Sequence, residues 1–354
     1  MHALVLKDVN QLEYLQVEKP SPKPGEALIK VMAAGVCGSD IPRVYRDGAH
    51  NMPLIIGHEF SGIVEDVFEA SEGERAQWLG KRVGIYPLIP CGKCSSCVKG
   101  IYETCKNYDY LGSRRDGGFA EYVCAPIKSL YVIPENVSYK AAAMLEPMAV
   151  AVHAMRRVNP RCEETVAVCG LGTIGILLTM FLIERKEKNI LVIGNKDFQK
   201  RIVGELGIPE ENYCDSSKND PIGFLMDHTS GEGVDGFFEC VGKNETVSLA
   251  VDTTGAMGRI CVVGNPYSDM LLEKNTYWKI LRNQINISGT WNSDSSDWKY
   301  VIEKLESGLI NPEALITHEY SLEKLPKGME IMRDKTEDYV KVMCCVCDKD
   351  NVKG

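Results

Sequence analysis

The stretch Thr165-Val-Ala-Val-Cys-Gly-Leu-Gly-Thr-Ile-Gly175 decides the fold class. Its first five residues predict a buried strand and the apolar run over 174–186 predicts a helix, so the glycines join a strand to a helix. In such a G-x-G-x-x-G turn the first glycine allows a tight turn and the second lets a pyrophosphate approach the backbone. The third lets the helix pack on the strand, and the phosphate lies at the helix N-terminus. The predicted dinucleotide loop comprises Gly170, Gly172, Thr173, Ile174 and Gly175.

Downstream of this turn, short buried strands alternate with helices. The predicted strands are 165–169, 189–193, 234–240, 259–263 and 285–289. The predicted helices are 174–186, 199–206, 245–253 and 277–282. Alternation of this kind is typical of an α/β fold in which a doubly wound parallel sheet has helices on both faces.

The chain on either side of this region has a different character. Residues 1–150 hold short β-type runs separated by Gly and Pro, which favours a mostly antiparallel, barrel-like region. Residues 291–354 hold one predicted helix and return to a strand. We predict that 1–150 and 291–354 form one β-rich catalytic domain, into which a dinucleotide-binding domain of residues 151–290 is inserted.

The second strand of the predicted parallel sheet ends in Gly194-Asn195-Lys196, where NAD-binding folds carry an acid that binds the ribose hydroxyls. A glycine leaves room for a 2′-phosphate, which Lys196 can neutralise, with Lys200 and Arg201 one turn further on. Asp197 is the competing acid, but its later position suits the N-cap of the next helix. NADP is therefore favoured over NAD, and the alternative is that Lys196 is a solvated loop charge.

Length, composition and charge limit the class of protein. The 354 residues suggest about two domains. The net charge of −9 is dispersed, which argues against nucleic-acid binding, because that requires basic surface. The sequence has neither a membrane-length apolar run nor a secretory signal pattern, so we expect a cytoplasmic protein without a membrane partner.

Four of the cysteines follow a metal-binding spacing, C-x₂-C-x₂-C-x₇-C, formed by Cys91, Cys94, Cys97 and Cys105. Two-residue gaps let neighbouring thiolates converge on one tetrahedral ion. Four sulfurs close the coordination shell, which predicts a structural zinc. A zinc-ribbon nucleic-acid module is the rival interpretation, but the segment lacks an aromatic and basic surface.

A second group of possible metal ligands lies in Cys37-Gly-Ser-Asp40, Gly57-His-Glu59 and Leu145-Glu-Pro147. A thiolate, an imidazole and a carboxylate suit a zinc ion with an open coordination position. Because a lone cysteine or histidine is more often structural, spacing alone leaves this site undecided.

Taken together, these motifs resemble, in order and spacing, those of the zinc-dependent medium-chain alcohol and polyol dehydrogenases over essentially the whole chain. The stretches 47–50, 57–62 and 111–122 are similar to the branch that oxidises polyol phosphates such as galactitol-1-phosphate. Sorbitol (L-iditol) and threonine dehydrogenases are more distant. The resemblance implies a Rossmann-type domain inserted in a GroES-like catalytic domain, NAD(P)-dependent hydride transfer, and a homo-oligomer, either dimer or tetramer.

The resemblance also implies roles for individual residues. Cys37, His58 and Glu146 would bind the catalytic zinc, with Glu59 as an alternative or transient ligand. Ser39 would relay the proton of the substrate alcohol to solvent, and Asp40 would orient His58. At position 194 this chain has glycine, where NAD-using relatives have an acidic residue.

For substrate binding, Arg114 and Arg115 are candidates to hold a sugar phosphate, because the guanidinium fork matches phosphate oxygens. In the alternative both pair with carboxylates, and Arg43 or Arg46 serves instead. His50 is either a substrate or cofactor contact or a surface histidine.

The predicted function is oxidation of a secondary alcohol of a polyol phosphate, or alternatively of an unphosphorylated polyol or other secondary alcohol of the sorbitol type. Two other classes agree less well with the sequence. A zinc-free quinone reductase relative would lack the ligands of both metal sites, and a nucleic-acid-binding zinc protein conflicts with the acidic composition.

Overall fold

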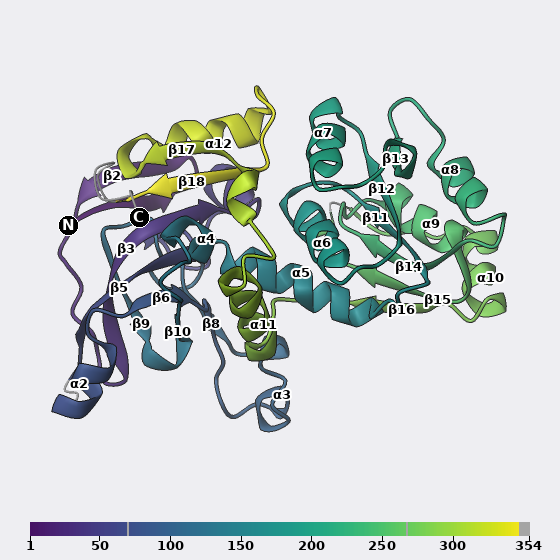
Figure 1. Cartoon of the computed structure of the whole chain (residues 1–354). Helices are drawn as coiled ribbons and strands as arrows, with labels where there is room; N and C mark the ends of the chain where they lie inside the picture. Colours follow the sequence, from purple (N-terminus) through teal and green to yellow (C-terminus); the bar gives the residue numbers. More distant parts are fainter. Residues whose placement is uncertain (69–70, 267, 347–354) are drawn as a thin grey trace. The chain divides into compact units, whose positions relative to one another are not determined.

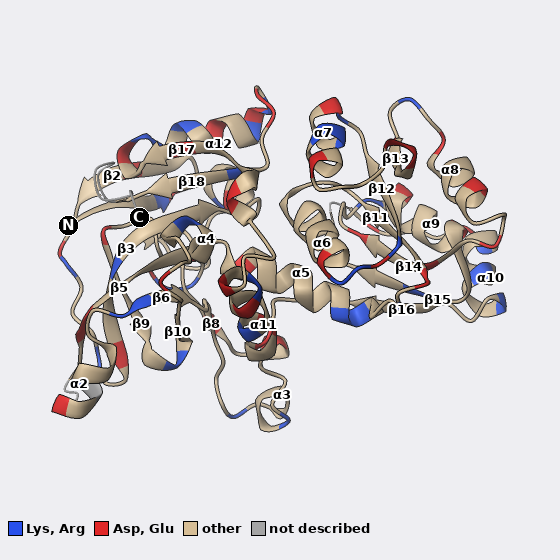
Figure 2. Cartoon of the chain, in the orientation of Figure 1, with Lys and Arg blue, Asp and Glu red and all other residues tan. Residues whose placement is uncertain are grey.

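The computed structural model describes residues 1–68, 71–266 and 268–346. The chain forms two compact units, Met1–Glu146 with Asp294–Gly354, and Pro147–Ser293. It passes from the first unit to the second within helix α5 (Leu145–Val158) (Figure 1). No helix in these described ranges has both the length and the apolar character needed to cross a bilayer. Acidic and basic residues are interspersed in both units, for example along α12 (Leu325–Asp334) (Figure 2).

The second unit is built on a six-stranded parallel sheet of order β13-β12-β11-β14-β15-β16. Its strands are β11 (Thr165–Cys169), β12 (Asn189–Gly194), β13 (Tyr213–Asp215), β14 (Val234–Glu239), β15 (Thr254–Val262) and β16 (Asn286–Gly289). Its helices beyond α5 are α6 (Thr173–Glu184), α7 (Asp197–Glu205), α8 (Pro221–His228), α9 (Asn244–Thr253) and α10 (Lys274–Arg282). Helix α6 packs on β11 and β12, while α9 packs on β14 and β15.

The register of this sheet brings the predicted cofactor residues to one edge. Strands β11 and β12 are parallel neighbours, with Cys169 opposite Ile193. The glycine turn that follows Cys169 and the Gly194 that ends β12 therefore lie side by side at the carboxyl ends of the strands. Open parallel sheets bind their ligands at this edge.

The first unit holds three sheets. The largest runs β10-β6-β5-β3-β18-β17, with β9 also pairing with β3, and the smaller ones are β2-β1-β4 and β7-β8. Its strands are β1 (His2–Asp8), β2 (Gln11–Gln16), β3 (Glu26–Val36), β4 (Leu54–Ile55), β5 (Glu59–Val67), β6 (Arg82–Ile85), β7 (Leu88–Ile89), β8 (Asp109–Tyr110), β9 (Tyr122–Pro126), β10 (Leu130–Val132), β17 (Ile316–Ser321) and β18 (Lys341–Cys345). Its helices are α1 (Asp40–Pro42), α2 (Glu72–Trp78), α3 (Ser95–Val98), α4 (Tyr139–Ala143), α11 (Ser295–Glu306) and α12, with short η turns between elements.

Close backbone packing fixes the loop that precedes β5. Gly57 has φ +95°, and a Cβ there would lie 2.6 Å from the Phe119 ring. A Cβ on Gly117 would lie 2.1 Å from the Gly57 carbonyl oxygen. The two glycines thus let the 112–117 loop lie directly against the backbone that leads into His58.

The predicted fold class, a mixed α/β protein with a parallel-sheet domain and a β-rich domain, is confirmed. The sequence patterns missed α8 and also β13, whose three residues are too few to show a period. Strand β15 begins five residues before the predicted 259–263 segment. Gly255 and Gly258 lie in the added part, and glycine weakens a strand signal in sequence.

Candidate active site and metal centres

The first candidate metal centre is assembled by strand pairing. In the antiparallel pair of β3 and β5, Gly35 lies opposite Glu59. Cys37 follows the end of β3 and His58 precedes the start of β5, so this register makes them neighbours. One ligand atom from each of Cys37, His58 and Glu59 lies within 4.8 Å of the others. A thiolate, an imidazole and a carboxylate at this separation form a donor set that suits zinc.

Asp40 stands behind this group as a fully buried carboxylate. Its Oδ1 lies 3.5 Å from Nδ1 of His58 and accepts a 2.5 Å hydrogen bond from Arg43, while Oδ2 accepts from the Cys37 amide. Burial alone would raise the pKa of Asp40, but His58, Arg43 and the Cys37 amide hold it below its usual value. The side chain is therefore placed to orient a ligating imidazole.

The two glutamates of the site have different partners. The Glu59 carboxylate accepts a 2.6 Å hydrogen bond from Nζ of Lys341, which is itself 2% exposed. Glu146, at the start of α5, accepts a 3.1 Å hydrogen bond from the Tyr110 hydroxyl. Burial raises the pKa of Glu146 to about 7. Ser39 is the residue before α1, and its hydroxyl makes no capping hydrogen bond.

The four-cysteine segment forms a second centre. The Sγ–Sγ distances are 3.9 Å for Cys91–Cys97, 3.6 Å for Cys94–Cys97 and 3.8 Å for Cys94–Cys105. A tetrahedral Zn–S site with bonds of about 2.3 Å has an edge of about 3.8 Å. Backbone hydrogen bonds from Cys97 and Lys106 lower the pKa of Cys94 to about 6, which favours its thiolate. The four sulfurs therefore fit one zinc ion with no open position.

The glycine turn after β11 has the shape of a dinucleotide cradle. Gly170 has φ +98°, and a Cβ on Gly175 would lie 1.9 Å from the Gly170 carbonyl oxygen. A Cβ on Gly172 would meet nothing within 4 Å, so the surface above it is open. Thr173 begins α6, whose N-terminus faces this loop. These features suit a pyrophosphate at the helix N-terminus.

At the end of β12 the predicted helix cap is wrong. Lys196 is the N-cap of α7, and Asp197 is the first residue of the helix. The Asp197 carboxylate lies 3.0 Å from Nζ of Lys218 instead of capping a backbone amide. Asn195 is exposed beside it, and Gly194 is buried.

The predicted substrate residues separate into two environments. Arg115 pairs with Glu26 at 2.5 Å and lies 3.7 Å from Asp109. The Arg114 guanidinium lies 4.5 Å from the centre of the Tyr108 ring, and its Nε is buried with no hydrogen-bond partner among the residues that the structure describes.

Arg114 belongs to a group of basic side chains that also includes Arg43 and His50. Burial, followed by the charges of Arg114 and Arg43, lowers the pKa of the otherwise exposed His50. Arg43 also reaches the Ser113 hydroxyl at 3.5 Å. Arg46, in contrast, is bound in bidentate fashion by Asp47.

Comparison with known proteins places this arrangement in a family. Residues 23–135 match the model of the alcohol dehydrogenase GroES-like domain, and residues 166–307 match that of the zinc-binding dehydrogenases. Galactitol 1-phosphate 5-dehydrogenase of Escherichia coli (strain K12) is 31% identical over 86% of this chain and 88% of its own. The chain belongs to the zinc-dependent medium-chain alcohol/polyol dehydrogenase family.

Other members of this dehydrogenase family align over the full length. A sorbitol dehydrogenase of Halalkalibacterium halodurans is 30% identical over 98% of this chain and all of its own. The crystal structure of galactitol-1-phosphate dehydrogenase from Escherichia coli superposes with a TM-score of 0.88 at 28% identity, covering 98% of this chain and all of that one.

Solved structures of the family hold either nicotinamide cofactor. A zinc-binding dehydrogenase from Sinorhizobium meliloti 1021 bound to NADP has a TM-score of 0.86 at 26% identity, over 97% of this chain and 98% of its own. The rspB dehydrogenase from E. coli CFT073, complexed with NADH, has a TM-score of 0.88 at 29% identity, over 98% and 99%. This chain is accordingly an NAD(P)-binding oxidoreductase.

Sequence reasoning missed two residues of this dehydrogenase's centre, Lys341 and Tyr110. Lys341 begins β18 between apolar residues, and a lysine inside a buried strand pattern is a signal that a buried partner exists. Tyr110 carried no such signal, because its contact with Glu146 depends on how β8 and α5 pack.

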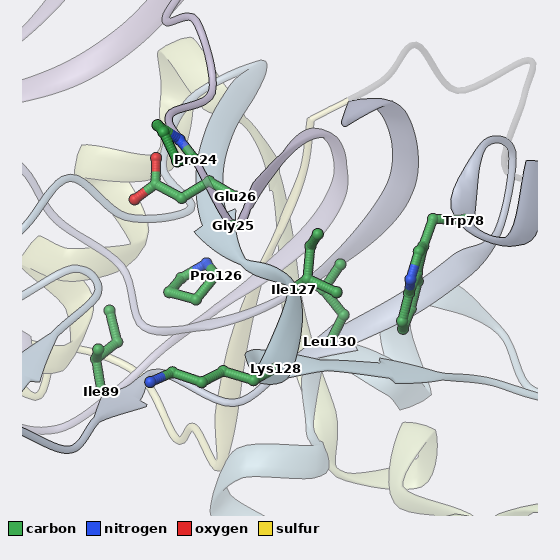
Figure 3. A pocket seen from close by; sticks show the side chains of 9 residues that line it. All are labelled: Pro24, Gly25, Glu26, Trp78, Ile89, Pro126, Ile127, Lys128 and Leu130. Atoms are coloured by element: carbon green, nitrogen blue, oxygen red, sulfur yellow. The ribbon is translucent and has the colours of Figure 1, made fainter. Parts of the chain in front are cut away.

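A separate hollow of the first unit is lined by Pro24, Gly25, Glu26, Trp78, Ile89, Pro126, Ile127, Lys128 and Leu130 (Figure 3). It includes none of the predicted site residues. Its Glu26 is the carboxylate that binds Arg115. The rest of the lining is mostly apolar. It adds no chemistry to the site.

The buried Lys341–Glu59 ion pair generates a stability prediction. Lys341→Met would leave the Glu59 carboxylate buried without a counter-charge, which costs about 3–5 kcal/mol. We expect the free energy of unfolding, measured by denaturant titration with circular dichroism, to fall by that amount. Adding Glu59→Gln should recover most of it.

The matched control is Lys140→Met, which breaks the more exposed pair with Glu319. It should change the free energy by less than about 1 kcal/mol. A Lys341→Met protein as stable as the wild type would contradict the prediction.

Proposed function

We propose that this dehydrogenase oxidises a secondary alcohol of a polyol phosphate, such as galactitol-1-phosphate, and passes the hydride to NADP. The observation that carries the proposal is the group formed by Arg114, His50 and Arg43, of which Arg43 binds Asp40; in the described part of the chain the Arg114 Nε is buried without a hydrogen-bond partner. Arginine matches phosphate because it presents several N–H groups in one plane. The group supports Arg114 and His50 as phosphate contacts and replaces Arg115 with Arg43.

In this proposal Cys37, His58 and Glu146 hold the catalytic zinc, and Glu59 is the alternative ligand. Zinc, when bound there, supplies the Lewis acidity that lowers the pKa of the substrate hydroxyl. Ser39 accepts the hydroxyl proton and passes it to solvent, while Asp40 keeps the His58 ring in place. The oxidised nicotinamide, when bound, would accept the hydride from the alcohol carbon, so the overall products would be a ketone, reduced cofactor and one proton.

Glu146 is favoured over Glu59 as the zinc ligand because Glu59 already has an ion-pair partner. Lys341 binds Glu59, and a Cβ on Gly35 would lie 2.3 Å from its Oε2, so the Glu59 carboxylate occupies a fixed niche. Among the described residues, the Tyr110 hydroxyl is the one hydrogen-bond donor to the Glu146 carboxylate. Its release toward a metal therefore costs no ion pair.

NADP is proposed over NAD because Gly194 offers no carboxylate to the ribose and Asn195 and Lys196 follow it. The two acids near this point, Asp197 and Asp215, both bind Lys218, at 3.0 Å and 2.8 Å. Lys218 therefore offsets one of these two negative charges.

The second candidate function is oxidation of an unphosphorylated polyol of the sorbitol type. It is favoured by the carboxylate partners of Arg43 and Arg115, which satisfy both guanidinium groups without an anion. The full-length similarity to a sorbitol dehydrogenase supports it equally.

A homo-oligomer formed through the second unit is also proposed. Strand β16 is the last strand of its sheet, and Ile287 on it is 42% exposed. Helix α10 exposes Tyr277, Trp278 and Leu281. An unpaired edge with exposed apolar side chains is suited to pairing with a second copy.

Initial rates with galactitol-1-phosphate, galactitol and sorbitol, each with NADP and NAD, test the substrate proposal. We expect the phosphorylated polyol to have the highest kcat/KM. Arg114→Met should lower that value by about 10- to 100-fold, because a hydrogen bond to a charged group is lost, and change the free polyols less than about twofold.

The control for that variant is Arg46→Met, whose guanidinium is bound by Asp47 and 71% exposed. It should leave the selectivity for phosphate unchanged. Faster turnover of the free polyols by the wild type would instead establish the second candidate function.

Metal analysis tests the zinc assignment. We expect about two zinc ions per chain in the wild type and about one in Cys94→Ser, because a three-sulfur site binds the ion weakly. The control is Cys162→Ser at an exposed cysteine, which should retain both. Unchanged zinc content in Cys94→Ser would refute the assignment of a structural zinc to the four cysteines.

Analytical ultracentrifugation tests the oligomer. Ile287→Lys places a charge at the centre of the edge strand and should shift the protein toward monomer. Leu309→Lys, at a residue of the first unit that is 61% exposed, is the matched control and should not. A wild-type monomer would exclude the proposal.

A further inference from the structure

The end of β12 is filled by the protein's own side chains. A Cβ on Gly194 would lie 2.7 Å from the Tyr213 hydroxyl, 2.8 Å from Oε1 of Gln199 and 3.1 Å from Cδ1 of Leu171. A Cβ this close would force the ends of the Tyr213 and Gln199 side chains to shift, so the cost of a side chain at position 194 depends on how firmly these two are held.

Hydrogen bonds hold those neighbours in place. Gln199 is 9% exposed; its Oε1 accepts from the Asn195 amide and its Nε2 donates to the Leu171 carbonyl, both at 3.0 Å. Leu171 lies within the glycine turn, so this one side chain ties the phosphate loop to the end of β12. Tyr213 donates to the Lys196 carbonyl at 3.0 Å, which fixes its hydroxyl next to Gly194.

Hydrogen bonds also satisfy the backbone groups next to position 194. The Asn195 amide is bound by Gln199, and the Gly194 carbonyl accepts from both the amide and the hydroxyl of Ser216 at 2.9 Å. An acid in the usual NAD position would have to displace Gln199 and Tyr213 and break this network. The chain therefore lacks an acid at position 194, and the neighbouring side chains also leave little space for one.

We propose that Gln199, together with Tyr213, determines the cofactor specificity of this dehydrogenase by occupying the place of the ribose-binding acid. The pair excludes a carboxylate at position 194 and leaves the ribose 2′ position to Lys196, which suits a 2′-phosphorylated adenine dinucleotide. The inference rests on the proposed NADP preference. It adds that the preference is built into the packing and is not reversed by one acidic substitution.

Equilibrium dissociation constants of NADP and NAD, measured by calorimetry on the zinc-loaded protein, provide the test. The proteins are the wild type, Gly194→Asp, Gln199→Ala/Tyr213→Phe and the triple variant. We expect Gly194→Asp alone to weaken both cofactors by about tenfold or more, because the new side chain collides with its neighbours. The triple variant should bind NAD at least about tenfold more tightly than Gly194→Asp does.

The control is Asn195→Asp, which adds the same charge at an exposed neighbour without crowding. It should weaken NADP through charge repulsion without the losses of NAD affinity and melting temperature expected of Gly194→Asp. If Gly194→Asp alone binds NAD more tightly than the wild type does, the inference is wrong. If Gly194→Asp does not fold, the triple variant must fold, and its failure would equally overturn the proposal.

The NADP preference can fail separately from this inference. A wild type that binds NAD more tightly than NADP refutes the preference. The collision at position 194 is still measured by the NAD affinities of Gly194→Asp and the triple variant.

Discussion

The antiparallel register of β3 with β5 and β18 is the constraint on which the reaction centre depends. Pairing with β5 sets Gly35 opposite Glu59 and makes Cys37 and His58 neighbours. Pairing with β18 sets Val36 opposite Val342, which brings Lys341 from near the end of the chain to the Val36 carbonyl and to Glu59. A one-residue slip would turn every one of these side chains to the other face of its strand. The donor set therefore exists because three strands, distant in sequence, share one register.

Buried charge is balanced locally throughout this centre. Lys341 offsets Glu59, and Arg43 offsets Asp40. Isolated buried charges are costly, so each carboxylate that the chemistry uses comes with a cation or a hydroxyl donor. Arg43 has two roles, because it binds the Asp40 carboxylate behind His58 and also belongs to the group of basic side chains with Arg114 and His50. A phosphate bound to that group would contact the residue that holds Asp40, so anion binding and metal-ligand orientation share one side chain.

In the second unit, strand pairing positions the predicted cofactor-binding residues. The parallel pairing of β11 and β12 delivers the glycine turn and Gly194 to one edge of the sheet. Gln199 then links the two at fixed separation. In the sequence, Gly194 shows only that the usual acid is missing. In the folded unit, the hydrogen-bonded side chains of Gln199 and Tyr213 crowd this position.

By itself the sequence determined the fold class, the dinucleotide loop, the four-cysteine cluster and the family, because each of these depends on residues close together in the chain or on periodicity. Local spacing reports local geometry: a strand, a G-x-G-x-x-G turn and C-x₂-C pairs carry their own signal. The tertiary structure alone decided the partners of the charged groups: Arg115 with Glu26, Arg43 with Asp40, Lys341 with Glu59, and Gln199 between Leu171 and Asn195. These contacts join segments that meet only when the strands pair and the loops pack. A charged or amide side chain accepts many partners, and which one it receives is a property of the whole fold.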